Sequence, residues 1–174
     1  WTHDGRMIYE ARAYAHSPVV TGFAPGYLRL QASLTLQLAL QAEYWVIDSQ
    51  TLAMQFTLSN ARVEPTEVRL DLYGHVGAQG QEQDLYILPL ADGQHALQYG
   101  RIGDLHPVVL LEQGSAQMVD GVVSSPKVGR SITIGGRKKV VLRAVHAAQG
   151  SDAESLAKAQ HWLAQDWKKH FRQI

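Results

Sequence analysis

Three successive segments of this chain alternate apolar and polar residues with a period of two. They cover residues 34–40, 52–58 and 68–72, and in each of them every second residue is Leu, Val, Met or Phe. Successive side chains of a β-strand point to opposite faces, so this pattern predicts strands with one buried and one exposed face, as in antiparallel sheets. The apolar face of such a sheet needs a covering layer. The alternation therefore predicts a second sheet, or a helix, packed against the first.

Shorter segments add further strands and the loops between them. Apolar or less regular runs of strand length follow the same logic: residues 6–15, 85–88, 96–99 and 108–111. Pro and Gly mark the expected loops: residues 17–26, 74–83 and 114–126. Residues 131–134 and 137–145 predict a hairpin in which Gly135 and Gly136 supply the positive φ of the turn. With about eight to ten strands in all, the prediction is a mainly β chain, a two-layer antiparallel β-sandwich.

The last part of the chain carries the clearest helix signal. Ser151 is followed three residues later by Glu154, the spacing of a capping box, in which each side chain binds a free backbone N–H of the other residue. Apolar residues then recur every three or four positions: Leu156, Ala159, Leu163, Trp167, Phe171 and Ile174. The spacing predicts one C-terminal α-helix of ~20 residues with one apolar face.

The simplest partition treats the chain as one structural unit. The sandwich occupies residues 1–148, and residues 149–174 form an amphipathic linker or docking helix. Trp162 and Trp167 lie about 140° apart on a continuous helix, so they cannot both face the sheet. We therefore expect one of them to meet another domain or a partner, which makes Trp162, Trp167 and Phe171 the candidate docking residues. In the alternative partition, the helix belongs to a following domain.

The charge balance disfavours two classes of partner. Sixteen Lys and Arg residues balance sixteen Asp and Glu residues, whereas nucleic acids and anionic membranes select for a basic excess. Neither a transmembrane helix nor a signal peptide is predicted, because no apolar run is long enough. We expect a soluble chain without nucleic-acid or membrane partners, and cytoplasmic and exported locations both stay open. Since the chain begins with Trp1, we expect it to be a piece of a longer polypeptide.

No residue pattern predicts a catalytic, metal or cofactor site. The sequence has no cysteine, which removes disulfides, thiolate ligands and Cys nucleophiles. The eight histidines are not spaced as pairs of metal ligands, and no two carboxylates stand out as a catalytic pair. Glycine-rich nucleotide loops and nucleophile elbows do not occur in the sequence. We therefore assign no catalytic residue, no metal ligand and no cofactor.

Aromatic residues are the remaining resource for a ligand. Tyr44 and Trp45 could belong to a platform on which sugar rings stack, because amphipathic rings suit such faces. Aromatic residues in strands also serve as cross-strand packing partners. Both interpretations stay open, and Tyr44 and Trp45 are the candidate carbohydrate-binding residues.

The second half of the chain resembles part of a known enzyme family. The segments that carry the resemblance are residues 101–111 (RIGDLHPVVLL), 131–134 (SITI), 140–148 (VVLRAVHAA) and 151–174, which ends in WKKHFRQI. Their order is similar to the N-terminal region of certain bacterial glycoside hydrolases of the glucoamylase-like and glycogen-debranching-like type. In that family a large antiparallel β-sandwich, a supersandwich, is followed by a helical linker and an (α/α)6 barrel.

The resemblance implies a non-catalytic N-terminal ancillary domain, because the catalytic carboxylates of that family lie in the barrel. The expected partner is the catalytic domain of the same polypeptide or a partner protein, with carbohydrate as a further candidate ligand. Two alternatives stay open. One is a stand-alone carbohydrate-binding or adhesion-type sandwich, and the other is a structural protein-interaction domain. Catalysis by this chain alone is not expected.

Overall fold

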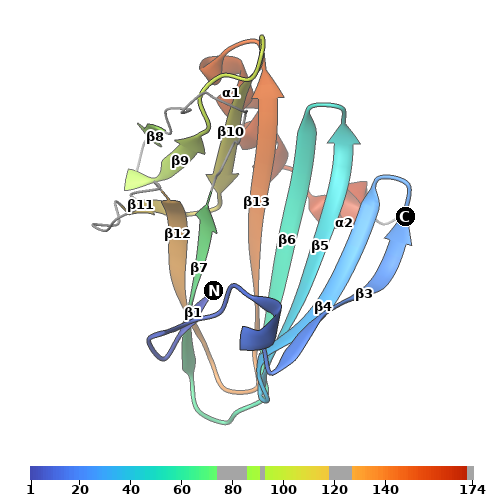
Figure 1. Cartoon of the computed structure of the whole chain (residues 1–174), viewed down its shortest axis with the longest axis vertical. Coiled ribbons are helices and arrows are strands. Elements are labelled where there is room, and N and C mark those ends of the chain that lie inside the picture. The colour runs from blue at the N-terminus through green and yellow to red at the C-terminus, as the bar shows by residue number, and fades with distance from the viewer. Residues whose placement is uncertain (74–85, 91–92, 118–126, 172–174) are drawn as a thin grey trace.

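The computed structural model describes residues 1–73, 86–90, 93–117 and 127–171, which form two antiparallel sheets and C-terminal helices (Figure 1). The smaller sheet has five strands in the order β11-β12-β7-β1-β2, and the larger has eight in the order β3-β4-β5-β6-β13-β10-β9-β8. The predicted two-layer sandwich is confirmed. The predicted loop at residues 74–83 lies outside the described residues.

The bounds of the elements follow the chain from the N-terminal strands to the C-terminal helices. The strands are β1 (Thr2–His3), β2 (Arg6–Met7), β3 (His16–Ala24), β4 (Tyr27–Thr35), β5 (Leu38–Asp48), β6 (Thr51–Asn60), β7 (Thr66–Tyr73), β8 (Tyr86–Pro89), β9 (His95–Gln98), β10 (His106–Leu111), β11 (Ser115–Gln117), β12 (Lys127–Ile134) and β13 (Lys139–Gln149). The helices are a 3₁₀ turn η1 (Ala11–Ala13), α1 (Asp152–Leu163) and α2 (Trp167–His170).

The alternating segments are strands, with one exception. Residues 52–58 and 68–72 lie in β6 and β7 as predicted. The prediction of one strand over residues 34–40 is wrong, because β4 ends at Thr35 and β5 begins at Leu38. Leu36 sits in the turn between them and is 82% exposed. A tight turn reverses the chain without disturbing the period-two spacing of the buried leucines on either side, so the pattern alone does not reveal it.

The first quarter of the chain differs more from the prediction. The strand expected over residues 6–15 is limited to β2, after which the chain forms η1. The loop expected at residues 17–26 is instead β3, an edge strand that pairs only with β4. Its register shifts twice, once across Pro18, and an edge strand tolerates proline because its outer N–H groups need no partner.

Residues 127–149 do not form the predicted hairpin. β12 pairs with β7 in the small sheet, whereas β13 pairs with β6 and β10 in the large sheet, so the intervening turn crosses between the two layers. Arg137 has a φ of 54°, a value that the prediction assigned to the glycines. Gly136 is required for another reason: a Cβ at this position would lie 1.6 Å from the carbonyl oxygen of Val63.

Two apolar clusters lie on opposite faces of the large sheet. The main core fills the space between the two sheets and includes Leu38, Leu58, Ile134 and Leu142, all nearly inaccessible to solvent. The second cluster lies on the outer face, where α1 and α2 cover the sheet, and Figure 1 shows these helices behind it. None of the described helices is long and apolar enough to cross a membrane.

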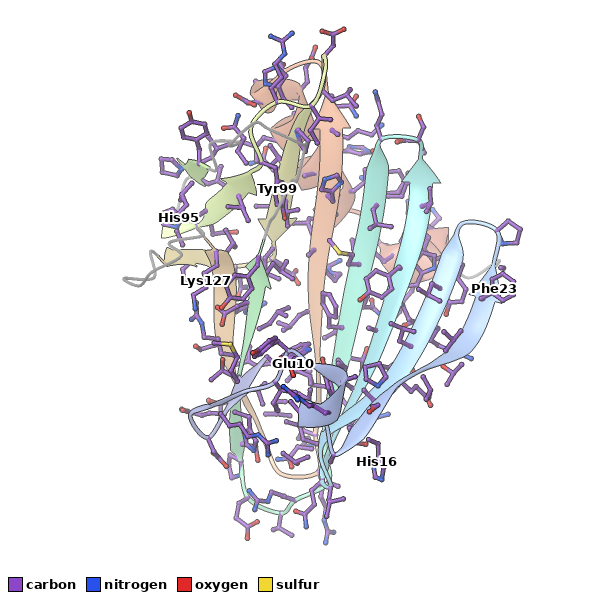
Figure 2. The ribbon with its side chains drawn as sticks, viewed as in Figure 1. Glu10, His16, Phe23, His95, Tyr99 and Lys127 are labelled. Carbon is purple, nitrogen blue, oxygen red and sulfur yellow. The ribbon has the colours of Figure 1, made fainter. Side chains whose placement is uncertain are left out.

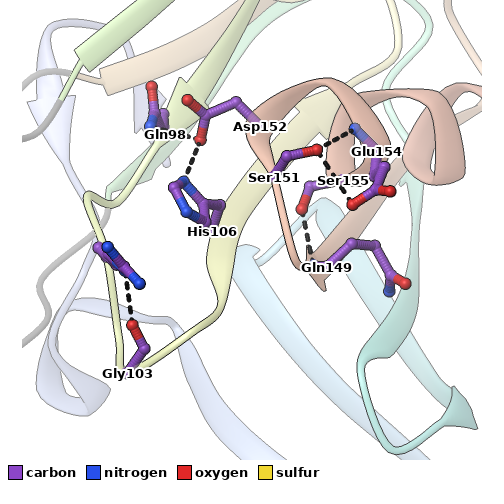
Figure 3. A network of polar contacts seen from close by, with 9 residues as sticks. Gln98, Gly103, His106, Gln149, Ser151, Asp152, Glu154 and Ser155 are labelled. Atoms are coloured by element: carbon purple, nitrogen blue, oxygen red, sulfur yellow. Dashed lines mark hydrogen bonds and ion pairs between the residues drawn. The ribbon is translucent and has the colours of Figure 1, made fainter.

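Polar contacts fix the start of α1 against the large sheet (Figure 3). The Ser151 hydroxyl accepts a hydrogen bond from the Glu154 N–H at 3.3 Å, which confirms the predicted N-cap. The Glu154 carboxylate accepts from the Ser151 hydroxyl at 3.0 Å and not from the Ser151 N–H that the predicted capping box assigned to it. The Asp152 carboxylate accepts from the Gln98 amide at 2.6 Å and lies 2.9 Å from Nδ1 of His106. These contacts hold the N-terminal turn of α1 over β9 and β10.

The outer face of the small sheet carries a buried charge cluster. The Asp71 side chain is 4% exposed and accepts from Nε of Arg69 at 2.7 Å, while Nζ of Lys127 lies 3.6 Å away. Gly129 is directly opposite Asp71 in the register, and a Cβ there would lie 2.2 Å from the carboxylate. The glycine therefore makes room for the ion pair.

Candidate functional site

The predicted docking residues pack on the protein's own sheet. The Trp167 ring is 4% exposed and meets Trp45 edge to face, with ring centroids 6.0 Å apart. Phe171 stacks on Trp45 with centroids 4.5 Å apart and an angle of 9° between the planes. These rings belong to the cluster beneath the helices, so they stabilise the attachment of the C-terminal segment. A docking role for Trp162, Trp167 and Phe171 stays a prediction.

A break in the helix brings both C-terminal tryptophans to the same side. α1 ends at Leu163 and α2 begins at Trp167, with the Asp166 carboxylate accepting hydrogen bonds from the N–H groups of Lys168 and Lys169. The predicted C-terminal helix is confirmed in α1, but its continuity over ~20 residues is wrong, because α1 ends after 12 residues. Residues 172–174 lie outside the described residues. The indole N–H of Trp167 donates to the carbonyl oxygen of Trp162 at 2.6 Å. The 140° separation does not apply across this break.

The two candidate carbohydrate-binding residues lie on opposite faces of β5. Trp45 is buried on the outer face under α2, whereas Tyr44 points into the space between the sheets, edge to face with Phe56 at 6.2 Å. The structure does not bring them together in one platform, because consecutive residues of a strand alternate between faces. Their carbohydrate-binding role stays a prediction.

The inner face of the large sheet extends beyond the small sheet and leaves an apolar surface open. We call this surface the open apolar face; it consists of Val20, Phe23, Leu28, Leu30, Tyr44, Val46, Leu52 and Met54. Phe23 is 80% exposed, Val20 61% and Val46 58%. In Figure 1 the small sheet and the N-terminal segment stand in front of other parts of the large sheet, and the upper parts of β4, β5 and β6 face the viewer.

The strand register makes this surface continuous. Phe23 is opposite Leu28, Leu28 is opposite Tyr44, and Tyr44 is opposite Met54, which gives one apolar row across β3 to β6. No Asp, Glu, Lys or Arg occurs among these eight residues. Contiguous exposed apolar surface of this kind marks sites of association. The sequence did not reveal it, because residues 17–26 were predicted to be a loop.

His146 of β13 is opposite Leu52 of the open apolar face in the register, and its ring faces that of Tyr99, which Figure 2 labels. Their rings lie 6.0 Å apart. Burial lowers the pKa of the His146 imidazole below its ordinary value of 6.5 and raises the pKa of Tyr99 to about 12. Both side chains are therefore neutral in the folded protein near neutral pH.

The lowered pKa of His146 predicts a loss of stability in mild acid. The unfolded chain binds a proton at His146 more tightly than the folded chain does, so the free energy of unfolding falls as the pH decreases below 6.5. One such group contributes a slope of at most about 1.4 kcal/mol per pH unit. Glutamine does not titrate, so the variant His146→Gln should show a weaker dependence of the free energy of unfolding on pH. Urea denaturation between about pH 7.5 and 5.5 measures this dependence. An unchanged slope would exclude His146 as the source.

The described residues do not present a constellation for chemistry. No group of three His, Asp or Glu side chains among them is placed to hold a metal ion. On the outer face, Glu112 binds Arg143 at 2.5 Å and Glu43 accepts from Tyr27 at 2.8 Å, so these carboxylates are used within the fold. What the described surface offers is an exposed apolar sheet face.

No protein-family model and no curated protein matches the sequence. Solved structures do match. Heparinase III is 10% identical with a TM-score of 0.60, and heparan sulfate lyase HepC from Pedobacter heparinus is 8% identical with a TM-score of 0.57. A human-microbiome protein described as a kojibiose phosphorylase is 10% identical with a TM-score of 0.55. At these identities the matches show the fold.

In each match, the aligned region makes up most of this chain but only a small part of the other protein. The matched regions include 88%, 84% and 82% of this chain but only 24%, 23% and 21% of heparinase III, HepC and the phosphorylase-like protein, respectively. This chain therefore has the fold of one part of each of these carbohydrate-active enzymes, and spans about a quarter or less of their length.

Proposed function

We propose that this chain is an N-terminal ancillary domain of a larger carbohydrate-active enzyme, a glycoside hydrolase or a relative, and does not itself catalyse the reaction. The observation that carries the proposal is the unequal coverage: nearly the whole chain matches about a quarter of each enzyme. The role of the domain is to pack against the catalytic part, which the family resemblance gives as a helical barrel.

The open apolar face is the surface that suits this packing. Trp45 and Trp167 are buried beneath the domain's own helices, and Trp162 and Phe171 are partly buried there, so this cluster leaves less apolar area free than the open apolar face does. Val20, Phe23 and Val46 are more than half exposed and share one sheet face. Burying exposed apolar side chains in an interface is favourable in proportion to the area removed from water. The catalytic domain is the partner that we propose for this surface.

The coding sequence around this segment gives the first test. We expect it to continue into a much longer, mostly helical domain on the C-terminal side. A reading frame that encodes only these residues would contradict the proposal. As a biochemical counterpart, the purified chain should show no turnover of maltohexaose, of kojibiose with phosphate, or of heparan sulfate. Turnover that copurifies with the chain through successive columns would overturn the non-catalytic assignment.

The docking surface gives a quantitative prediction. In the triple variant Val20→Ser, Phe23→Ser, Val46→Ser, the affinity for the separately expressed remainder of the same polypeptide should fall at least about tenfold, because three apolar side chains no longer contribute buried area to the interface. The free energy of unfolding of the chain should change little, because the three side chains are exposed.

The matched control is Leu36→Ser. Leu36 is as exposed as Phe23 but lies in the β4–β5 turn at the opposite end of the sheet. The affinity of this variant should equal that of the unmodified chain in the same titration calorimetry experiment. Equal losses in the control and in the triple variant would place the interface elsewhere.

A further inference from the structure

The outer face of the large sheet has an uncovered polar half with a hollow of about 470 Å³. It lies beside the part that α1 and α2 cover, across β3, β4, β5, β6 and β13. Two cross-strand rows form its floor. Gln31, Gln41 and Thr57 are direct neighbours in one row, and Ser33, Ala39 and Ser59 in the next. We call this site the polar hollow.

The shape of the polar hollow follows from these two rows. The row of Ser33, Ala39 and Ser59 has short side chains, while the neighbouring row carries the long amides of Gln31 and Gln41. Because side chains of one face are two residues apart along a strand, the rows are about 6.7 Å apart. The short row therefore forms a trough with an amide wall along one side.

Apart from Ser17, whose hydroxyl donates to the carbonyl oxygen of Ala11 at 3.0 Å, the described hydrogen-bonding side chains of the hollow are not used within the fold. Among the described residues, the side chains of Gln31, Gln41 and Thr57 make no hydrogen bond to the protein. The adjacent row toward the helices is different, since Glu43 accepts from both Tyr27 and Gln55. Free amides and hydroxyls, each able to donate and accept, are thus concentrated in the hollow.

The charges at the rim limit what can bind. Lys139 and His16 are the titratable side chains of the lining, at opposite ends of the row of short side chains, and Figure 2 shows His16 at the lower end of β3. The lining has no carboxylate, so a metal ion or a cationic ligand is disfavoured. A polyanion is also disfavoured, because the ammonium of Lys139 is one positive charge and a polyanion requires several. Neutral polyhydroxylated ligands remain.

We propose that the polar hollow binds a neutral oligosaccharide. The proposal rests on the proposed function for the choice of carbohydrate among neutral ligands. Adjacent strands are about 4.8 Å apart, so a sugar chain that lies across them meets a new amide or hydroxyl at each strand. The hydroxyl groups of successive rings pair with Gln31, Gln41 and Thr57 in turn, and the ring edges lie over Ala39.

The test is a titration of the full chain with maltohexaose and with cellohexaose, followed by NMR chemical shifts and calorimetry. We expect saturable binding of at least one of them.

The double variant Gln31→Ala, Gln41→Ala should raise its Kd about tenfold or more, because the amide hydrogen bonds to the sugar hydroxyls are lost. Ala39→Tyr, which fills the trough, should abolish binding. Gln50→Ala, an amide in the β5–β6 turn, is the matched control and should leave Kd unchanged.

Several results would overturn the inference. They are absence of saturation with both probes, undiminished binding in the double variant, or an equal loss in the control. A heparan sulfate hexasaccharide serves as the anionic probe, and binding of this probe alone would refute the neutral class. Unchanged thermal unfolding midpoints separate loss of the site from loss of the fold. Failure of the titration leaves the ancillary role intact, since that role is tested by the coding sequence and by docking.

Discussion

Trp167→Ala is expected to lower the free energy of unfolding by about 3–5 kcal/mol, the usual range for removing a buried tryptophan. The ring is 4% exposed and contacts Trp45 and Phe171, and the Arg143 guanidinium lies 5.4 Å from its centroid. Alanine leaves a cavity beneath α2 and removes the hydrogen bond to the Trp162 carbonyl. Because the second apolar cluster depends on these contacts, the attachment of α1 and α2 to the sheet weakens.

Urea denaturation followed by circular dichroism measures this loss, and Trp162→Ala is the control. Trp162 is only partly buried and packs against the same cluster. Its backbone carbonyl accepts the hydrogen bond from the Trp167 indole, and the substitution retains this carbonyl. We expect the control to lose less than half as much stability as Trp167→Ala. Equal losses, or a loss below about 1 kcal/mol for Trp167→Ala, would contradict the central place of Trp167 in the cluster.

Asp71→Asn is expected to lower the free energy of unfolding by about 3–5 kcal/mol. Removing one partner of a buried ion pair leaves the other charges without compensation. Asp71 is the carboxylate that faces both Arg69 and Lys127, whose side chains are 18% and 11% exposed. Asparagine keeps the shape of the side chain and removes only the charge. The destabilisation therefore reports on the electrostatics of the small sheet.

A double variant and an exposed control sharpen this measurement. Asp71→Asn combined with Lys127→Met removes one surplus charge and should recover part of the lost stability. Asp104→Asn breaks the pair of Asp104 and Arg101, whose side chains are 99% and 64% exposed, and should have little measurable effect. If the two single carboxylate variants are equally stable, the cluster at Asp71 is not a buried ion pair in solution.

The sequence was most informative where one face of an element is buried. The alternation in residues 52–58 and 68–72 and the cap at Ser151 predicted β6, β7 and the start of α1 correctly. These are local signals, because a side chain's spacing or its bond to a nearby N–H is determined within a few residues. The two-layer architecture follows from the same apolar faces.

The errors lie where long-range pairing decides the structure. Residues 131–145 read as a hairpin because two strands flank two glycines, but β12 and β13 find partners in different sheets. The candidate site was missed for a related reason. β3 has no fully buried residue and contains Pro18 and Gly22, so its sequence resembles a loop, and only its pairing with β4 shows that Phe23 and Val20 extend the apolar face.

The position of β13 has a consequence for how the chain folds. β13 lies between β6 and β10 and joins two groups of strands, β3–β6 on one side and β8–β10 on the other. Its pairing of Lys139 with Ser59 spans 139 − 59 = 80 residues, and such distant pairings make folding slow, in milliseconds to seconds. During synthesis, the large sheet cannot form completely until residue 149 has left the ribosome. Until then β6 and β10 are edge strands whose backbone groups on one side have no partner strand.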